Sequence, residues 1–494
     1  MSGTETEPQA GGTGVATQEV GDFAALLNRE FKPKTDRARE AVEQAVQTLA
    51  QQALAHTALI SGESLRSIEA MIAAIDAKLT EQINVIMHHE DFQKVESAWR
   101  GLHYLVNNTE TDEMLKIRVF NVSKKELGRT LKKFRGTPWD QSPIFKKIYE
   151  EEYGQFGGSP YGLLMGDYEF DHGPQDVQLL GDIAQISAAA HTPFIAAASP
   201  IVMQMESWNE LSNPRDLTKI FQTPEYAAWR SLRESEDSRY IGLAMPRFLS
   251  RLPYGEKTEP VDEFHFEEDV DGADSSKFCW TNAAYAMATN ITRSFKLYGW
   301  TTRIRGIESG GAVEGLPAYT FPTDDGGVDM KCPTEIAISD RREAELAKNG
   351  FMPLIHKKNS DFAAFIGAQS LQKPQEYEDP AATANANLSA RLPYLFACCR
   401  FAHYLKCMVR DKIGSTMSQS QLQDWLSNWI IQYVGPSDAP EDYKASHPLS
   451  EAKVILEANE ENPGYYSAKF YLKPHYQLEG LTVSLRLVSR VPSK

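Results

Sequence analysis

The feature of the sequence that most constrains the fold is a strand–helix–strand pattern between residues 161 and 198. Tyr161–Met165 is a short apolar run, and Phe194–Ala198 is a second one. Between them, Asp176–Ala190 carries apolar residues at helical spacing. A helical crossover returns the chain to the same end of a sheet, so the two strands must run in the same direction. The pattern therefore predicts a parallel β-sheet.

A predicted helix and a glycine-rich turn lead into this unit. Ser142 and Pro143 are typical of a helix start. The serine hydroxyl can cap the first turn, and the backbone N–H that proline lacks would have no partner within the helix at this position. An apolar stripe follows at helical spacing, formed by Ile144, Ile148 and Tyr149. The helix is predicted to end in a turn that contains Gly154, Gly157, Gly158 and Pro160.

The alternation of strands and helices continues through the middle of the chain. Further strands are predicted at Leu115–Val122, Tyr240–Ala244, Thr301–Ile307, Glu335–Ile338 and Phe351–Ile355. Further helices are predicted at Pro224–Glu234, Trp280–Tyr298 and Asp340–Lys348, and after a capping box formed by Ser123 and Glu126. The loops are predicted at Tyr254–Ser276 and Ser309–Gly327, which are acidic or rich in glycine. Such an alternation favours a central sheet with helices on its faces.

The residues before this region are predicted to be helical, at Thr35–His56, Ser64–Met87 and Glu90–Val106. Their apolar residues are spaced alternately by three and four positions, as in helices that pack along a narrow seam. In the third helix they are Phe92, Val95, Trp99, Leu102 and Val106. Gly21–Phe31 is a shorter amphipathic helix, whereas residues 1–20 contain almost nothing to bury and are predicted to form a disordered leader.

The last part of the chain combines long helices with alternating strands. The helices are predicted at Thr383–Lys412 and Ser418–Val434, and the strands at Ala452–Leu456, Tyr466–Leu472 and Leu481–Ser489. We therefore predict an α/β protein with an N-terminal helical region, a central, mostly parallel sheet flanked by helices, and a C-terminal β segment. The predicted parts are the leader (1–20), the helical region (21–110), the central α/β domain with loop insertions (111–380) and the C-terminal helices and strands (381–494).

The overall charge argues against one large class of partners. The chain has 51 Lys and Arg against 67 Asp and Glu, a net charge of −16, so a nucleic-acid partner is not expected. The sequence contains no apolar run of membrane-spanning length and does not begin like a signal peptide, so no membrane insertion is expected. The five cysteines lack the paired Cys-x-x-Cys spacing of a zinc site and are expected to be buried thiols in a reducing cytoplasm.

Three patterns could indicate chemistry, and each has a simpler explanation. The glycines at 154, 157, 158 and 162 resemble a phosphate loop, but Leu163 stands where lysine would be needed. His88-His89-Glu90-Asp91 could suggest a metal, although adjacent histidines point to different faces of a helix, and Asp91 can serve a helix N-terminus. We therefore predict no catalytic, cofactor-binding or metal-binding residue.

Asp167 and Asp182 are the third pattern, a possible carboxylate pair near the end of a strand. Enzymes with a parallel sheet place their active sites at that end. No nucleophile and base stand beside these two carboxylates in the sequence. An α/β enzyme with a carboxylate site at the carboxyl ends of the strands is the alternative reading.

Three separated stretches resemble one known family. PWDQSPIFKKIYEEEYGQFGGSPYGLLMGDYEF at Pro138–Phe170 is similar to the large subunit of the type VI secretion contractile sheath, the TssC or VipB family. HHEDFQKVESAWRGLHYLV at His88–Val106 resembles the N-terminal signature of that family, and KPHYQLEGLTVSLRLVSRVP at Lys473–Pro492 resembles its C-terminal one. The order of elements between the three also fits, so the resemblance covers most of the chain.

This resemblance implies a structural protein and not an enzyme. A large sheath subunit is expected to pair with the small sheath subunit (TssB or VipA) and to polymerise with other sheath subunits around a tube of Hcp hexamers in the cytoplasm. Contraction of the sheath would drive the tube outward. Baseplate components and the ClpV disassembly ATPase are the other partners that the resemblance implies, and no cofactor is expected.

Two sets of partner-binding residues follow from the resemblance. ClpV would recognise the apolar face of the short N-terminal helix, formed by Phe23, Leu26, Leu27 and Phe31. The alternative is that this face packs on the protein's own helices. Strand linkage between subunits would use the C-terminal β region, where alternating strands offer edges to a partner. The predicted linkage residues are Leu481, Val483, Ser484, Leu485, Arg486 and Leu487.

Overall fold

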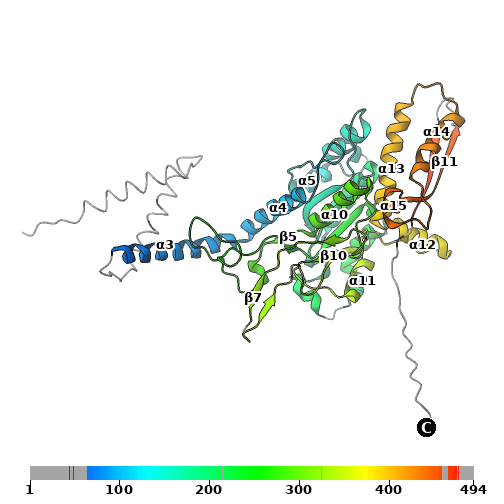
Figure 1. Cartoon of the computed structure of the whole chain (residues 1–494). Helices are drawn as coiled ribbons and strands as arrows, with labels where there is room; N and C mark the ends of the chain where they lie inside the picture. The colour runs from blue at the N-terminus through cyan, green and yellow to red at the C-terminus, as the bar shows by residue number, and fades with distance from the viewer. Residues whose placement is uncertain are drawn as a thin grey trace, which may run out of the picture. The chain divides into compact units, whose positions relative to one another are not determined.

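The computed structural model describes residues 44, 48, 64–136, 138–213, 216–272, 274–323, 325–458, 466–475 and 477 (Figure 1). The chain falls into two compact units. The first consists of Met1–His89 together with Pro253–Asp269, and the second of Glu90–Leu252 together with Val270–Lys494. The predicted helices at 21–31 and 35–56, and the predicted strand at 481–489, lie outside the described residues or almost entirely so.

The first unit is built on one long helix. Helix α3 spans Ser64–Met87, as the spacing of its apolar residues predicts. Its C-terminal half is tied to the loop of the same unit, because the Asn84 side chain donates a hydrogen bond to the Glu267 carbonyl (3.0 Å) and accepts one from the Asp269 amide (2.8 Å). Only Asn84 and Met87 are buried among the helix residues whose burial is described.

The second unit contains a six-stranded sheet in the order β1-β2-β3-β9-β10-β6. Its strands are β1 (Leu164–Phe170), β2 (Phe194–Ala198), β3 (Ile241–Met245), β9 (Phe351–His356), β10 (Ala363–Phe365) and β6 (Ala312–Val313). The first four run parallel, and β10 is antiparallel to both β9 and β6. The predicted α/β fold class with a mostly parallel central sheet is therefore confirmed.

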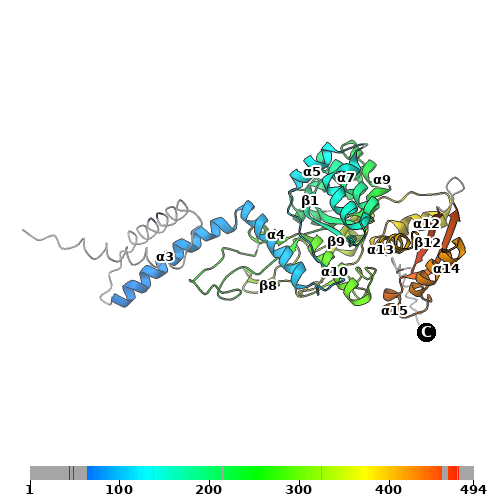
Figure 2. The same ribbon diagram turned by 90° about the horizontal axis from the view of Figure 1, so that it is seen from above.

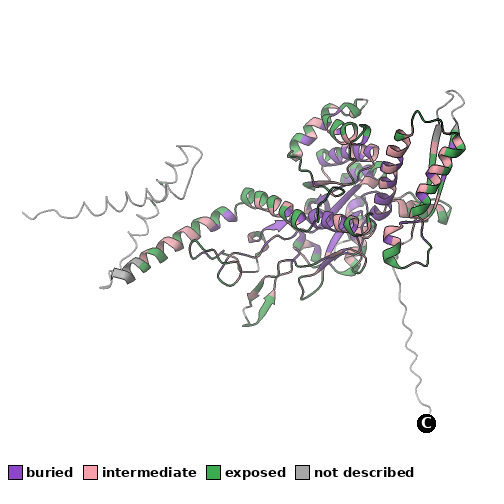
Figure 3. Ribbon diagram, turned by 45° about the horizontal axis from the view of Figure 1, so that its top comes forward, coloured by how far each residue is buried: buried purple, intermediate pink, exposed green. Residues whose placement is uncertain are grey.

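Two layers of helices cover this sheet, and successive residues of one strand serve opposite layers. Ala196 of β2 packs into a core with α7 (Pro174–Ala190), α9 (Ala227–Glu234) and α11 (Asp340–Lys348). Its neighbour Ile195 packs into a second core with α10 (Ala283–Tyr298) and the start of α13 (Leu392–Asp411). Figure 2 shows α7 and α9 on one side of the strands and α10 on the other, and Figure 3 shows the strands buried between them.

The other elements before the C-terminal part are short, apart from α4. The helices are α4 (Glu90–Asn107), α5 (Lys124–Lys133), α6 (Pro143–Phe145), a π-helix at Lys146–Gly154, α8 (Leu217–Gln222) and 3₁₀ turns at Trp139–Gln141, Pro200–Met203, Trp208–Ser212, Pro224–Tyr226, Asp237–Tyr240 and Ser275–Lys277, with a further 3₁₀ turn in the C-terminal part at Ile431–Tyr433. Two small hairpins pair β4 (Phe248–Leu249) with β5 (Trp280–Thr281) and β7 (Thr320–Pro322) with β8 (Val328–Met330).

The C-terminal part has a core of its own. Its helices are α12 (Pro380–Ser389), the second half of α13, α14 (Gln419–Ile430) and α15 (Glu441–Ser446). They are followed by an antiparallel hairpin of β11 (Leu449–Ala458) and β12 (Tyr466–Pro474). Phe401, Leu426 and Val454 are buried in the core between the helices and the hairpin. The predicted long helix at 383–412 is two helices, because Pro393 begins the second one.

Three predicted strands are wrong. Leu115–Val122, Thr301–Ile307 and Glu335–Ile338 have no ladder with a neighbouring strand. Their backbone groups bind elsewhere: the Asp112 carboxylate accepts the Leu115 amide at 2.8 Å, and the Ser294 hydroxyl accepts the Arg303 amide at 3.2 Å. Alternating apolar residues indicate a half-buried extended segment, but a strand also requires a partner that local sequence does not supply.

Two boundaries are shifted as well. The first strand occupies Leu164–Phe170 and not Tyr161–Met165, since the Tyr161 carbonyl accepts a hydrogen bond from the Thr192 hydroxyl (2.8 Å) before the ladder begins. The helix predicted from Trp280 begins at Ala283, because Trp280–Thr281 pairs as a strand. Among the described residues, no helix is both long enough and apolar enough to span a membrane.

Candidate functional site

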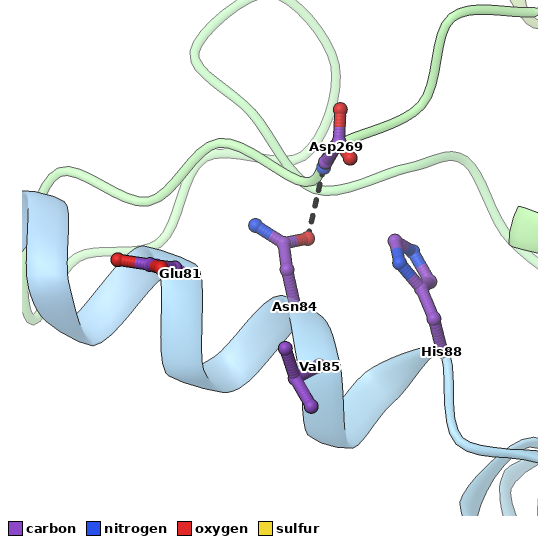
Figure 4. A pocket seen from close by; sticks show the side chains of 5 residues that line it. All are labelled: Glu81, Asn84, Val85, His88 and Asp269. Atoms are coloured by element: carbon purple, nitrogen blue, oxygen red, sulfur yellow. Dashed lines mark hydrogen bonds between the residues drawn. The ribbon is translucent and has the colours of Figure 1, made fainter.

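A surface hollow of about 440 Å³ lies in the first unit, lined by Glu81, Asn84, Val85, His88 and Asp269 (Figure 4). Figure 4 shows Asn84 directed at the backbone of Asp269, with His88 beside them. The His88 ring lies 3.5 Å from the Glu268 carboxylate of the same unit. These polar groups hold a loop against α3, and in the described part of the chain no group of three or more His, Cys, Asp or Glu could hold a metal ion.

The two carboxylates that suggested an enzyme lie on opposite faces of the sheet. The Asp167 carboxylate accepts a hydrogen bond from Asn282, the cap of α10, at 3.2 Å. Burial raises the pKa of Asp167, against the effect of this bond. Asp182 is on α7, in the other layer, where Arg135 binds both of its oxygens at 3.0 and 2.6 Å. The structure does not bring them together.

The glycine-rich turn serves the backbone. Gly157 has a positive φ of 81°, which disfavours other residues. A Cβ at Gly158 would lie 2.4 Å from the Glu152 carbonyl oxygen, so the chain can pass there only without a side chain. These glycines end the π-helix that follows the Ser142 cap, whose hydroxyl accepts the Phe145 amide as predicted.

Helix α4 has an apolar face that the described part of the chain leaves uncovered. We call it the α4 stripe and define it as Phe92, Val95, Trp99 and Val106, which are between 40% and 69% exposed. The positions are separated by three, four and seven residues, so they share one side of the helix. The predicted seam contains these four residues and Leu102. The four face outward, whereas Leu102 is half-buried and packs against the core formed by Leu105 and Tyr285.

The opposite face of α4 is fixed to the second unit. Leu105 and Tyr285 of α10 are buried together, and a Cβ at Gly101 would lie 2.3 Å from the Tyr285 ring. The Glu96 carboxylate binds Arg251 at 2.6 Å and Arg100 at 2.7 Å. Burial acts to raise the pKa of Glu96, but the two guanidinium groups outweigh it and the pKa is lowered. The α4 stripe is therefore presented on a firmly held helix.

The C-terminal hairpin has two different outer edges. Near the end of β11, the Leu456 amide binds the Gln423 side chain (3.1 Å) and its carbonyl accepts from Gln419 (2.6 Å), both from α14. At the start of β11, the Leu449 carbonyl accepts the Gly435 amide (2.9 Å). The outer edge of β11 is thus occupied at both ends.

No strand among the described residues pairs with the outer edge of β12. Leu456 of β11 is directly opposite Ala468 of β12. The N–H and C=O groups of Leu456 point away from β12, so the two residues form a non-hydrogen-bonded pair, and the N–H and C=O groups of Ala468 point away from β11. The two-residue period extends this orientation to Phe470 and Leu472. Side chains at 468, 470 and 472 are half-buried while those at 469, 471 and 473 are exposed, as the alternation predicts.

The predicted partner-binding residues are outside the described part of the chain. This holds for Phe23, Leu26, Leu27 and Phe31, and for Leu481, Val483, Ser484, Leu485, Arg486 and Leu487. Neither the exposure of the α4 stripe nor the difference between the two hairpin edges was predicted from the sequence. The heptad-like spacing of the α4 stripe is a sequence signal for a surface that binds another helix. The difference between the hairpin edges has no such signal, because it depends on α14 side chains that meet β11 only in the folded chain.

Comparison with known families decides the identity. Residues 69–372 match the VipB family, described as EvpB/VC_A0108, tail sheath N-terminal domain. Residues 381–491 match VipB_2, described as EvpB/VC_A0108, tail sheath gpW/gp25-like domain. The chain belongs to the TssC/VipB family of type VI secretion sheath proteins. It is 73% identical over 495 residues to the type VI secretion system sheath protein TssC1 of Pseudomonas aeruginosa, covering 100% of this chain and 99% of that protein.

Solved structures of contractile injection systems show weaker likenesses. The anti-feeding prophage baseplate gives 11% identity and a TM-score of 0.39 over 76% of this chain and 83% of the other. The contracted sheath complex of the extracellular contractile injection system PVC gives 9% identity and a TM-score of 0.34 over 63% and 68%. At these TM-scores the likenesses add nothing to the family assignment.

Family membership settles the broad function. This TssC/VipB protein is a structural subunit of a contractile sheath that assembles with other sheath subunits, and it is not an enzyme. The enzyme alternative has no support, because its two carboxylates lie in different layers of the fold.

Proposed function

We propose that this chain is the large subunit of the sheath, which co-assembles with the small sheath subunit into a helical tubule around the Hcp tube and contracts to propel it. The α4 stripe is the observation that carries this proposal. Four large apolar side chains at heptad-like spacing stand in solvent on a helix whose other face is already packed. Such a surface is complementary to a second amphipathic helix.

The energetics of the α4 stripe fit a permanent partner. Burying one large apolar side chain contributes roughly 1.5–3 kcal/mol, so four of them can supply most of a tight interaction. Obligate interfaces are more apolar than the rest of a protein surface. We assign the small sheath subunit as the partner that supplies the covering helix.

The hairpin provides the proposed link between neighbouring subunits. Ala468, Phe470 and Leu472 direct their backbone groups away from β11, where an additional strand can pair. The alternating segment 481–489 of another subunit has the right pattern, and its linkage residues remain those that the sequence predicts. A third strand would also pair with the outward backbone groups of Ala468, Phe470 and Leu472.

The remaining partners are proposed from the family. The short helix with Phe23, Leu26, Leu27 and Phe31 would bind ClpV, and the ends of the tubule would contact baseplate components, all in the cytoplasm. We also propose that the boundary between the central and C-terminal parts lies between residues 380 and 381. The work of contraction would come from a free-energy difference between two packings of the same subunits.

A double substitution in the α4 stripe tests the proposal. Val95→Glu with Trp99→Glu places two charges on the exposed face, where they do not disturb the core with Tyr285. We expect affinity for the small sheath subunit to fall at least about a hundredfold and tubules to disappear, because two apolar contacts are replaced by buried charges. Co-purification and negative-stain electron microscopy of the co-expressed subunits measure both.

Ile413→Glu is the matched control, since Ile413 is 79% exposed and is not part of the α4 stripe. It should leave the tubules unchanged. Equal thermal unfolding of all variants would show that the fold is intact. Normal tubules with the double variant would refute the assignment of the α4 stripe.

A further inference from the structure

Helix α5 carries a basic face that points to solvent. Residues 124–135 contain six Lys or Arg against one acidic residue, Glu126. Lys124 and Arg135 are engaged within the fold, since each binds a carboxylate of α7 at 2.6 Å. The other four are exposed, and we define them as the α5 basic face: Lys125, Arg129, Lys132 and Lys133.

The four cations share one side of the helix, because they follow the i, i+4, i+7 and i+8 spacing of a helical face. Leu127 and Leu131 lie on the other side and are buried in the core with α7. The capping box of Ser123 and Glu126 fixes the first turn, and the two ion pairs with α7 tie both ends of α5. The α5 basic face is therefore held in a fixed orientation.

No carboxylate in the described part of the chain binds the α5 basic face. Its four side chains form no hydrogen bond or ion pair with the residues that the structure describes. Glu126 interacts electrostatically with Arg129, but its carboxylate already accepts hydrogen bonds from the amide and the hydroxyl of Ser123, at 3.1 and 2.9 Å. Four cations on one rigid helix face attract an acidic partner.

Membranes and nucleic acids fit this face poorly. A helix that lies on a membrane inserts its apolar side, whereas Leu127 and Leu131 of α5 are already in the core. The net charge of −16 makes the whole chain repel polyanions. An acidic protein surface is the better partner, and a sheath subunit has other copies of its own chain as neighbours.

The chain has an acidic surface of its own in the first unit. Residues 256–269, which we call the acidic loop, contain seven Asp or Glu and one Lys. The loop is held on α3 by the two Asn84 hydrogen bonds described above. Asp262 and Glu263 are exposed and form no hydrogen bond or ion pair with described residues. The acidic loop is therefore complementary in charge to the α5 basic face.

We propose that the α5 basic face of one copy binds the acidic loop of another copy in the assembled sheath. This inference rests on the proposed tubule, in which many copies lie side by side. The two surfaces are different parts of the chain, so a copy bound through α5 still offers its loop to the next copy. Such head-to-tail contacts repeat into rings or helical filaments. Each surface ion pair is weak, but several pairs at every contact specify which surfaces meet.

Two charge-reversed variants test the contact, each co-expressed at full length with the small sheath subunit. The first carries Lys125→Glu, Arg129→Glu, Lys132→Glu and Lys133→Glu, and the second carries Glu256→Lys, Glu259→Lys, Asp262→Lys and Glu263→Lys. The yield of tubules, counted by negative-stain electron microscopy, should fall at least about tenfold for each variant alone, because like charges then face each other. Co-expression of both variants should restore at least about half of the wild-type yield, since each reversed surface meets the opposite charge on the other variant.

A third variant controls for overall charge. Its four substitutions change the net charge as much as the first variant does, but they affect exposed lysines outside α5: Lys219→Glu, Lys348→Glu, Lys357→Glu and Lys358→Glu. Co-expressed with the loop variant, it should not restore the tubules. Restoration equal to that by the α5 variant would show that overall charge is responsible and would overturn the inference.

The inference and the proposed function fail separately. Wild type that forms no tubules with the small sheath subunit would refute the proposed assembly. Wild-type yield from either reversed variant alone, or no gain on mixing them, would instead overturn the contact between copies, and a contact within one chain would give no gain. Zero-length carbodiimide cross-linking of wild-type tubules needs no variant to fold. It should join a lysine of the α5 basic face to a carboxylate of the acidic loop, and the absence of this cross-link would overturn the inference.

Discussion

The central sheet and the C-terminal hairpin of the second unit are both β-structures covered by helices, but they differ in how the backbone groups of their strands are hydrogen-bonded. The strands β2, β3 and β9 are hydrogen-bonded on both sides and lie between two helical layers. The hairpin is covered on one side by α14, and the outer edge of β12 has no ladder among the described residues. The first region is complete in one chain, whereas we propose that the second is completed by a strand of another subunit.

Replacing one phenylalanine by alanine in each region should show the largest difference between them, measured as the loss in the free energy of unfolding. Phe351→Ala removes a fully buried ring that stacks on Trp229, so we expect a loss of about 3–5 kcal/mol in the free energy of unfolding. Phe470→Ala in β12 removes a half-buried ring and should cost only about 1–2 kcal/mol. Denaturant unfolding of the full chain measures both, and equal losses would contradict the contrast.

Low pH should destabilise the contact between α13 and α7, which lies between the two regions. His403 of α13 is buried, and its Nε2 donates to the Ala190 carbonyl at the end of α7 (2.8 Å). Burial lowers the pKa of His403 to about 4, so the folded chain keeps this ring neutral. Between the ordinary pKa of 6.5 and about 4, the unfolded chain binds a proton that the folded chain does not. Stability is therefore full above pH 6.5 and is lost as the pH falls towards 4.

The variant His403→Gln keeps a side-chain donor for Ala190 but cannot titrate. We expect wild type to lose about 3 kcal/mol more than this variant between pH 6.5 and 4, from the size of the pKa shift. Urea unfolding at both pH values provides the comparison. Parallel losses in the two proteins would show that His403 is not responsible.

The smallest effect on stability is expected at the edge of the hairpin. Ala468→Pro removes an amide that points away from β11, and proline is tolerated at such an edge, so the fold should lose no more than about 1 kcal/mol. Tubules should nevertheless fail, because the proposed linkage needs that amide.

Lys469→Pro is the matched variant, since it removes an amide from the ladder with Ile455 and should disrupt the hairpin itself. Thermal unfolding and negative-stain microscopy together separate the two effects. Normal tubules with Ala468→Pro would exclude the edge of β12 as the linking edge.

Local sequence was sufficient for elements whose signals lie within the element. Helix α3 at Ser64–Met87, β2 at Phe194–Ala198 and α11 at Asp340–Lys348 have the predicted bounds, because period and caps are properties of consecutive residues. The capping box of Ser123 and Glu126 is present for the same reason. The family was also recognisable from three stretches of sequence.

Tertiary structure decided the features that depend on distant residues. Leu115–Val122 alternates as a strand would, but in the part of the chain that the structure describes it has no ladder with another strand. The α4 stripe was visible as a seam, but its outward direction depends on Gly101 and Leu105 filling the place beside Tyr285. The available edge of β12 depends on Gln419 and Gln423 reaching Leu456. Periodicity specifies which residues share a face, and only the folded chain determines which face remains for a partner, because burial is a property of the whole fold.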